Sequence, residues 1–183
     1  MVRQVPRSIS GSISGSVSAR LAAAPAYSYR DDASVPAFDD TKPLIIYDGV
    51  CILCSHTMRA LAQRDRAGVI QYASAQSPLG QALFRHYGLD PVAFESVLLL
   101  QQGHAFGKLD MAFALAELIG GPWRLVSMFR PLPRRLQDSL YDLVAKNRYR
   151  LFGRSKTCLM PDQSWRDRVI DRPASSASDI AKL

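Results

Sequence analysis

The sequence contains little cysteine and no long apolar segment. Only three cysteines occur in 183 residues, and a small, odd number of thiols excludes a secreted domain held together by disulfides. Every uninterrupted apolar run is far shorter than the roughly 18 residues that a transmembrane helix needs. The first arginines are not followed by an apolar run of seven or more residues, so a secretory signal peptide is not indicated.

The composition instead fits a folded domain with an uneven distribution of charge. The chain is 48% hydrophobic and 21% charged, which excludes disorder throughout, and its length suits one domain with extra segments. The formal net charge is +7. Residues 41–122 carry six basic and six acidic side chains, whereas residues 123–172 carry twelve basic and five acidic ones. The basic excess therefore belongs to the C-terminal half.

Residues 1–41 are predicted to form a disordered or targeting leader. Residues 8–18 repeat serine and glycine with single apolar residues between them, and such a segment buries too little apolar surface to offset its chain entropy. The first 30 residues contain four arginines and no acid, which also fits an organellar transit peptide. We therefore expect a cytoplasmic protein with a disordered extension, or an organellar one if the leader is a transit peptide.

The middle of the chain alternates between strand and helix patterns. Short apolar runs predict strands, and apolar residues at helical spacing predict helices. Strands are predicted at 44–47, 69–73, 96–100 and 104–108, and helices at 51–66, 78–87 and 110–119, the last capped by Asp110. This β-α-β-α-β-β-α order makes the first two strands parallel and the last two an antiparallel hairpin. The expected fold is a thioredoxin-like α/β sheet with additional C-terminal helices.

A C-x-x-C motif lies where the first predicted strand meets the first predicted helix. Its cysteines are Cys51 and Cys54, and beside a β-α-β pattern this spacing is typical of a redox-active pair. Free N–H groups and the helix dipole favour an anion at a helix N-terminus. An unperturbed thiol is only about 3% thiolate at pH 7, and a pKa lower by ~1.5 units makes about half of it thiolate. Cys51 is therefore predicted to attack a disulfide, and Cys54 to resolve the mixed disulfide.

Other uses of these cysteines stay open. Ser55 follows the motif, so it is not a C-x-x-C-H haem attachment site. A zinc site needs four ligands. The residues that supply four on paper are Cys51, Cys54, His56 and Cys158, but the sequence has neither a second C-x-x-C nor a paired histidine. Two incidental thiols are the third alternative. Cys158 is expected to be a structural thiol, with a secondary redox role left open.

Asp48 stands three residues before Cys51. It can cap the helix or accept a hydrogen bond in the Asp-Gly turn. It can also accept a proton from a thiol during exchange. A nearby carboxylate raises the pKa of a thiol, which opposes the helix dipole. Both roles stay open, and the candidate catalytic residues are Cys51, Cys54 and Asp48.

Residues 47–54, Tyr-Asp-Gly-Val-Cys-Ile-Leu-Cys, resemble the DCC family of thiol-disulfide oxidoreductases, whose D-x-x-C-x-x-C signature these residues match. Further segments are similar to the family pattern in the same order: 64–66, 72–77, 80–88, 96–100, 121–124 and 147–154, followed by Cys158. The resemblance implies one thioredoxin-like domain over residues 42–172, before a flexible tail at 173–183. The family's Ser-Asp pair is Leu109-Asp110 here, and no proline directly precedes the strand predicted at 96–100.

The basic C-terminal half is predicted to add two helices, at 123–129 and 136–149. An apolar stripe on the second consists of Leu136, Leu140, Leu143 and Val144. The basic side chains fit a solvated face on helices packed against the sheet, a surface for an acidic partner or anionic lipid, or a nucleic-acid surface. No known nucleic-acid-binding module or interleaved aromatic pattern occurs, so nucleic acid is not expected.

These patterns predict a thiol-disulfide oxidoreductase that acts by dithiol–disulfide exchange. The expected substrate is a disulfide- or thiol-bearing protein or small molecule, and the sequence does not identify the reducing partner. The alternative is a thioredoxin-like binding module that docks an acidic partner through its basic C-terminal half. No cofactor, metal or transmembrane segment is expected, and a peripheral anionic surface stays open as a partner.

Overall fold

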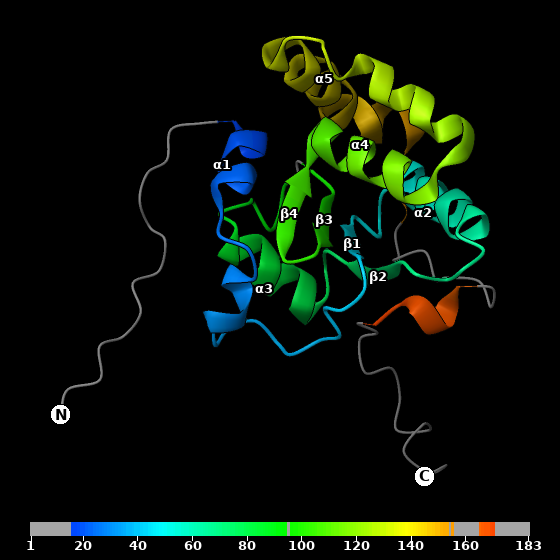
Figure 1. Cartoon of the computed structure of the whole chain (residues 1–183). Coiled ribbons are helices and arrows are strands. Elements are labelled where there is room, and N and C mark those ends of the chain that lie inside the picture. Colours follow the sequence, from blue (N-terminus) through cyan, green and yellow to red (C-terminus); the bar gives the residue numbers. More distant parts are fainter. Residues whose placement is uncertain (1–15, 95, 154, 156–164, 171–183) are drawn as a thin grey trace, which may run out of the picture.

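A computed structural model describes residues 16–94, 96–153, 155 and 165–170 (Figure 1). Its centre is a four-stranded sheet in the order β2-β1-β3-β4. The strands are β1 (Leu44–Tyr47), β2 (Gln71–Ser74), β3 (Leu98–Gln101) and β4 (His104–Gly107). The helices that connect or follow them are α2 (Ile52–Arg64), α3 (Pro78–His86) and α4 (Lys108–Ile119). Each predicted strand and helix of this region is present, with ends shifted by a few residues.

The pairing of the strands confirms the thioredoxin-like α/β fold. Strands β1 and β2 are parallel, because α2 carries the chain back across the sheet between them. Strand β3 is antiparallel to both β1 and β4. The tight turn between β3 and β4 uses Gln102 and Gly103, both at positive φ (50° and 78°), which matches the twist that a two-residue hairpin requires.

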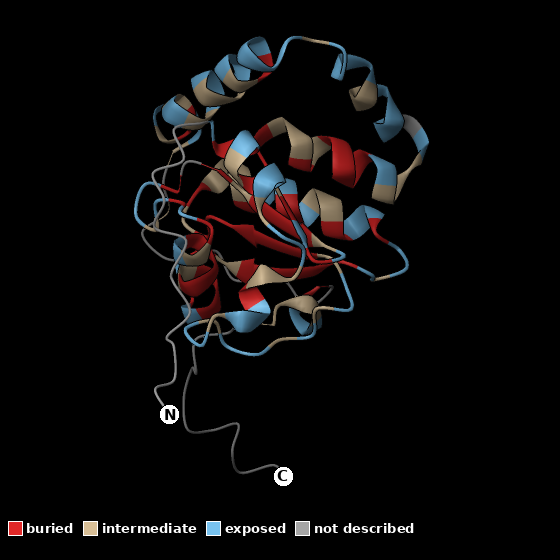
Figure 2. Ribbon diagram, turned by 60° about the vertical axis from the view of Figure 1, so that its left-hand side comes forward, coloured by how far each residue is buried: buried red, intermediate tan, exposed pale blue. Residues whose placement is uncertain are grey.

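Alternate residues of the central strand build two hydrophobic layers. Leu44 and Ile46 of β1 face a core that includes α3, whereas Ile45 and Tyr47 face a core that includes α2 and α4. This is the alternation that a strand gives to its side chains. Figure 2 shows the buried sheet between these helices. Both faces are covered, which explains why all four residues of β1 are buried.

Residues 16–40 differ from the disorder expected of the leader. They form helix α1 (Val17–Ala23), the 3-10 helix η1 (Ser28–Asp31) and connecting loops. The α1 residues Val17 and Leu21 are buried in the same core as α3, and a Cβ on Gly107 of β4 would come within 2.6 Å of Leu21 Cδ1. Glycine thus lets α1 approach β4 closely. Residues 1–15 lie outside the described residues, and the targeting role of the leader stays a prediction.

Two further helical segments follow the sheet, as the sequence predicts. They are the 3-10 helix η2 (Gly121–Phe129) and the long helix α5 (Arg134–Phe152). The buried Lys108 joins the start of α4 to α5, because its Nζ lies 2.8 Å from Asp142 Oδ1. Helix α4 begins at Lys108 with Gly107 as its N-cap residue, so the predicted capping role of Asp110 is wrong, and Asp110 lies in the first turn instead. Within the described residues, no helix has the length and apolar character needed to cross a membrane.

A short C-terminal segment closes against strand β2. It contains the 3-10 helix η3 (Arg166–Arg168), after which the Ile170 N–H donates a hydrogen bond to the Tyr72 carbonyl at 3.0 Å. Arg168 forms an ion pair with the buried Asp65 at 3.0 Å. Trp165 is buried and contacts the Tyr72 ring edge-on, with ring centroids 5.0 Å apart. Residues 165–170 therefore belong to the folded domain.

Candidate active site

The cysteine pair lies where β1 ends and α2 begins, as predicted. Cys51 is the N-cap residue of α2, and its Sγ accepts a hydrogen bond from the Cys54 backbone N–H at 3.3 Å. An N-cap acceptor satisfies one of the free N–H groups at a helix start. A sulfur at this position feels the positive end of the helix dipole. The geometry therefore favours a negative charge on Cys51.

The two thiols differ in acidity. The Cys54 side chain donates a hydrogen bond to Cys51, and together with the Cys54 N–H and the positive charge of Arg148 it lowers the pKa of Cys51 from 9.0 to about 7. Burial and the charge of Asp48 oppose this change. The same hydrogen bond, with burial, raises the pKa of Cys54 strongly. A pKa of about 7 corresponds to about half thiolate at pH 7, whereas the raised pKa of Cys54 favours its thiol form.

The cysteine with the lower pKa, Cys51, is the less exposed of the two. The Cys51 residue has 0% exposed surface, whereas Cys54 is half-buried. The chain just after α5 lies over this turn, because the Ser155 N–H donates to the Val50 carbonyl at 2.9 Å and a Cβ on Gly153 would lie 3.3 Å from Ile52 Cδ1. The segment after α5 therefore contacts the residues on either side of the buried Cys51.

Asp48 is buried at the centre of a hydrogen-bond network. Its Oδ1 accepts from the Val50 N–H at 3.1 Å and from Gln76 Nε2 at 2.7 Å. Its Oδ2 accepts from the Tyr149 hydroxyl and from Arg148 Nη2, the latter at 3.4 Å. The turn contact with Val50 is one of the roles expected for Asp48. The expected capping of α2 by Asp48 is wrong, because Cys51 is the N-cap residue.

Arg148 connects the cysteine pair to α5. It is buried, pairs with Asp48, and donates a further hydrogen bond to the Ala93 carbonyl at 3.2 Å. Sequence reasoning missed three members of this network: Gln76, Arg148 and Tyr149. The signal that could have found them was present, because all three lie in segments that carry the family resemblance, 72–77 and 147–154.

Other candidate residues lie away from this network or outside the description. His56 is exposed on α2. Cys158 lies outside the described residues, so its expected structural or redox role is untested. Among the residues that the structure describes, no three or more His, Cys, Asp or Glu side chains gather in a metal-binding arrangement.

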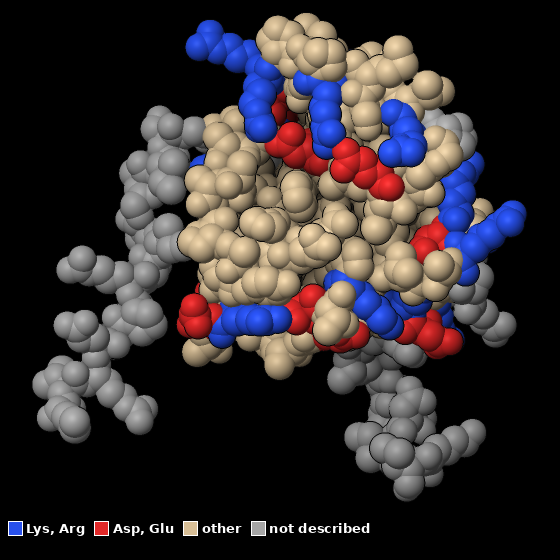
Figure 3. Space-filling view, in the orientation of Figure 1, with Lys and Arg blue, Asp and Glu red and all other residues tan. Residues whose placement is uncertain are grey.

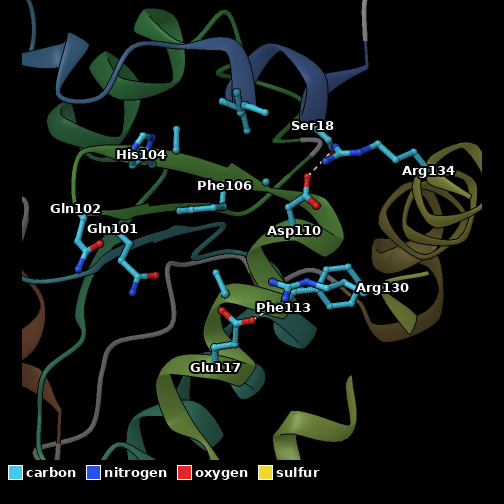
Figure 4. Close-up of a pocket in the computed structure, with 15 residues that line it drawn as sticks. Ser18, Gln101, Gln102, His104, Phe106, Asp110, Phe113, Glu117, Arg130 and Arg134 are labelled. Atoms are coloured by element: carbon cyan, nitrogen blue, oxygen red, sulfur yellow. Dashed lines mark hydrogen bonds and ion pairs between the residues drawn. The ribbon is translucent and has the colours of Figure 1, made fainter. Parts of the chain in front are cut away.

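A pocket of about 430 Å³ lies elsewhere, over β4 and α4 and beside α1. Figure 4 shows Arg134 paired with Asp110 and Arg130 paired with Glu117 at its rim, at 3.1 and 2.7 Å. Neither Cys51 nor Cys54 lines it. The pocket is therefore separate from the cysteine pair.

Comparison with known proteins agrees with this site. The sequence profile of the DCC1-like thiol-disulfide oxidoreductases matches residues 45–154. The uncharacterized protein YuxK of Bacillus subtilis is 34% identical over 127 residues, which cover 69% of this chain and 93% of YuxK. A chloroplastic DCC family protein of Arabidopsis thaliana is 31% identical over 121 residues, which cover 66% of this chain and 70% of the plant protein. No solved structure matches significantly.

Proposed function

Because this chain belongs to the DCC1-like thiol-disulfide oxidoreductase family, we propose that it exchanges disulfides through Cys51 and Cys54, with Cys51 attacking and Cys54 resolving. The observation that carries this proposal is the position of Cys51 as the N-cap residue of α2, where its Sγ accepts the Cys54 N–H at 3.3 Å, and the lowered pKa of Cys51 beside the raised pKa of Cys54 agrees with it. The thiolate is the nucleophile in disulfide exchange. The more acidic sulfur is therefore assigned to the attack, although it is the less exposed one.

The proposed reduction of a disulfide R–S–S–R proceeds in two exchanges. The Cys51 thiolate attacks one substrate sulfur, forms a mixed disulfide and releases the first thiolate, which takes a proton from solvent. Cys54 then loses its proton and attacks the Cys51 sulfur, which forms the Cys51–Cys54 disulfide and releases the second thiol. The substrate gains two electrons and the dithiol loses two. A thiol reductant returns the pair to the dithiol form, and the reverse sequence oxidises a substrate dithiol.

The loss of the proton from Cys54 becomes easier after the first exchange. The high pKa of Cys54 arises first from its hydrogen bond to Cys51 and then from burial. When the Cys51 sulfur is bonded to the substrate in the mixed disulfide, it no longer carries a negative charge. Its interaction with the Cys54 S–H is then weaker, and the pKa of Cys54 falls. The neighbouring Arg148 also lowers the pKa of Cys54. The attack by Cys54 thus follows from the chemistry of the first step.

We assign Asp48 to the positioning of Arg148. A carboxylate offers about four acceptor sites, and the Asp48 oxygens already accept four hydrogen bonds. Taking a proton from a thiol would require one of these partners to leave. The role that fits this geometry is to hold the Arg148 charge beside the two sulfurs. The proton-acceptor role considered from the sequence is the less suitable of the two.

The substrate class is set by the chemistry of the pair: a protein or small molecule that carries a disulfide or a thiol.

The expectation of a cytoplasmic protein stays a prediction. The Arabidopsis relative is named as chloroplastic, which is consistent with the organellar alternative. If the whole predicted leader, residues 1–41, were cleaved as a transit peptide, the core would lose the buried side chains of Val17 and Leu21. We therefore expect any cleavage to fall before α1.

The decisive experiment is the reduction of insulin disulfides with dithiothreitol as the reductant, using the full chain. We expect the wild-type protein to accelerate the reaction and Cys51→Ser to abolish the acceleration. Cys54→Ser should accumulate a mixed disulfide that mass spectrometry maps to Cys51. Unchanged activity in Cys51→Ser, or a mixed disulfide that maps to Cys158 in Cys54→Ser or to Cys54 in Cys51→Ser, would contradict the proposal.

A further inference from the structure

Helices η2 and α5 together expose an unusual number of large apolar side chains, and we call this area the η2–α5 surface. From η2 it includes Trp123, Leu125, Met128 and Phe129. From α5 it includes Leu136, Leu140, Leu143, Val144 and Leu151. Exposed fractions reach 72% for Met128 and 65% for Leu151. Figure 2 shows these two segments as largely exposed or intermediate, in contrast to the buried sheet and to the inner part of α4. The sequence predicted an apolar stripe here, and the structure places it in solvent.

The exposed stripe of α5 is not the side that packs on the domain. The inward side carries the buried Gln137 and Arg148, and Asp138 and Asp142 turn toward the Lys108 ammonium. The exposed leucines at 136, 140, 143 and 151 recur three, four and eight residues apart, so they share the opposite side of the helix. Helix α5 is thus apolar on its outside and tied by polar contacts on its inside.

Exposed cations border this apolar stripe, and within the part of the chain that the structure describes they have no acidic partner. Arg135, Lys146 and Arg150 are exposed and are separated by eleven and four residues, which places them in a second row next to the leucines. Together with Arg124 of η2, they form no ion pair with any acid of the described residues, whereas Arg130 and Arg134 are paired with Glu117 and Asp110. In Figure 3, Lys and Arg side chains stand at the end of the molecule that η2 and α5 form, with Asp and Glu side chains directly beside several of them. The outer side of this surface therefore combines apolar area with positive charge that no acid of the described residues compensates.

We propose that the η2–α5 surface docks on an anionic lipid bilayer, with α5 lying in the plane of the interface. A helix with an apolar side bordered by Lys and Arg binds in this way, because the apolar side chains enter the boundary between headgroups and acyl chains. The cations meet the negative surface potential of anionic headgroups. Trp123 adds an aromatic ring of the kind that settles at headgroup level.

The charge of the surface distinguishes this occupant from a second copy of the chain. A symmetric contact would bring the same unpaired cations of two chains together, and like charges across an interface oppose association. An acidic protein would satisfy the cations, but it would have to supply an apolar face of matching shape as well. A bilayer supplies both negative charge and an apolar layer, and it does so without needing a surface of matching shape. The observations therefore favour lipid over either kind of protein partner.

Docking would leave the redox site attached to the bound helix. Arg148 and Tyr149 lie on the inward side of α5 and hold Asp48 beside the cysteine pair. The bilayer and the active site thus contact opposite sides of one helix. The docking itself depends on the outer side of α5 and η2 and not on the proposed redox chemistry, so the two proposals can fail independently.

The test is binding of the full-length protein to vesicles, measured by co-sedimentation. We expect binding to phosphatidylcholine vesicles that contain phosphatidylglycerol, little binding to phosphatidylcholine alone, and weaker binding at high salt. The triple variant Arg135→Glu, Lys146→Glu, Arg150→Glu should lower the partition coefficient by at least about 100-fold. The double variant Leu140→Gln, Leu143→Gln should lower it by about tenfold or more even at low salt.

The matched control is Lys42→Glu, Arg66→Glu, Arg85→Glu, which changes the net charge equally with three exposed residues outside this surface. It should bind anionic vesicles nearly as well as the wild type. Insulin reduction and circular dichroism check that every variant is folded. A wild-type protein that binds vesicles but does not reduce insulin would contradict the proposed function and leave the docking proposal intact. The docking proposal is overturned if wild type ignores anionic vesicles, or if the control loses as much binding as the patch variant. It is equally overturned if gel filtration shows a dimer that Leu140→Gln, Leu143→Gln dissociates, or if polyglutamate binds and vesicles do not.

Discussion

The sharpest prediction concerns the hydrogen bond that Cys54 donates to Cys51. Cys54→Ala removes the S–H donor but leaves the backbone N–H at 3.3 Å from Cys51 Sγ, and it leaves Arg148 in place. Cys54→Ser keeps a hydroxyl donor at the same position. The two variants therefore differ in the one contact that contributes most to the low pKa of Cys51.

The size of the effect follows from the strength of a hydrogen bond to a charged group, about 1.5–3 kcal/mol. At 1.36 kcal/mol per pKa unit, its loss raises the pKa of Cys51 by about 1–2 units, from about 7 toward the ordinary value of 9.0. At pH 7 the thiolate fraction then falls from about half to about 1–10%. Cys54→Ala should thus slow thiolate reactions at pH 7 by roughly 5- to 50-fold, whereas Cys54→Ser should stay close to the wild type.

The assay is the rate of alkylation of Cys51 by iodoacetamide as a function of pH, followed by mass spectrometry of the peptide that contains residue 51. The wild-type rate should rise through a midpoint near pH 7, and the Cys54→Ala midpoint should lie at higher pH. A small reagent is needed because Cys51 has no exposed surface. If Cys54→Ala retains the midpoint near pH 7, the side-chain hydrogen bond is not the cause and the reasoning is refuted. A midpoint in Cys54→Ser that rises as far as in Cys54→Ala would refute it as well.

Three further predictions test the surroundings of the pair and the N-terminal packing. Arg148→Gln should raise the pKa of Cys51, seen as a shifted alkylation profile, and should cost about 3–5 kcal/mol in the free energy of unfolding by urea, because Asp48 loses its buried partner. Arg148→Lys keeps the charge, so it should restore much of the alkylation profile, and a profile unchanged in Arg148→Gln would remove Arg148 from the site. Tyr149→Phe should cost about 1–3 kcal/mol in the same urea measurement, because a buried carboxylate loses a donor, and a cost near zero would mean that water replaces the hydroxyl. Leu21→Ala should cost about 2–5 kcal/mol, with Ala22→Gly on the outer side of α1 as its matched control, and an equal loss in both would show that α1 propensity, not burial, matters.

The local parts of the fold were predictable, whereas contacts distant in sequence were not. The run at 44–47 and the motif at 51–54 carry their own signals, because a buried strand and a C-x-x-C pair are encoded within a few residues. The pairing of Asp48 with Arg148 spans 100 residues and depends on the return of α5 across the site. No local pattern contains that information.

Two segments show why composition alone misled. Residues 16–23 resemble the serine-rich stretch before them, but Val17 and Leu21 are buried against the core, and Gly107 of β4 leaves the room that Leu21 occupies. In α5 the sequence showed a leucine stripe but not which side packs on the domain, and a buried arginine, a glutamine and two aspartates paired with a lysine occupy the inner side. A polar inner side can be recognised only when its partners are known.

The outer strands of the sheet owe their protection to chain beyond the family match at 45–154. Helix α1 packs beside β4, and the segment 165–170 forms a bridge with β2 at Tyr72, whose carbonyl accepts the Ile170 N–H (Figure 1). Bare strand edges offer unpaired N–H and C=O groups that pair with other chains. A fragment cut at the limits of the family match would keep both cysteines and all of the sheet except Leu44, yet its outer strands would lose these contacts, and exposed strand edges invite aggregation. Expression designs should therefore begin at or before residue 16 and continue through residue 170.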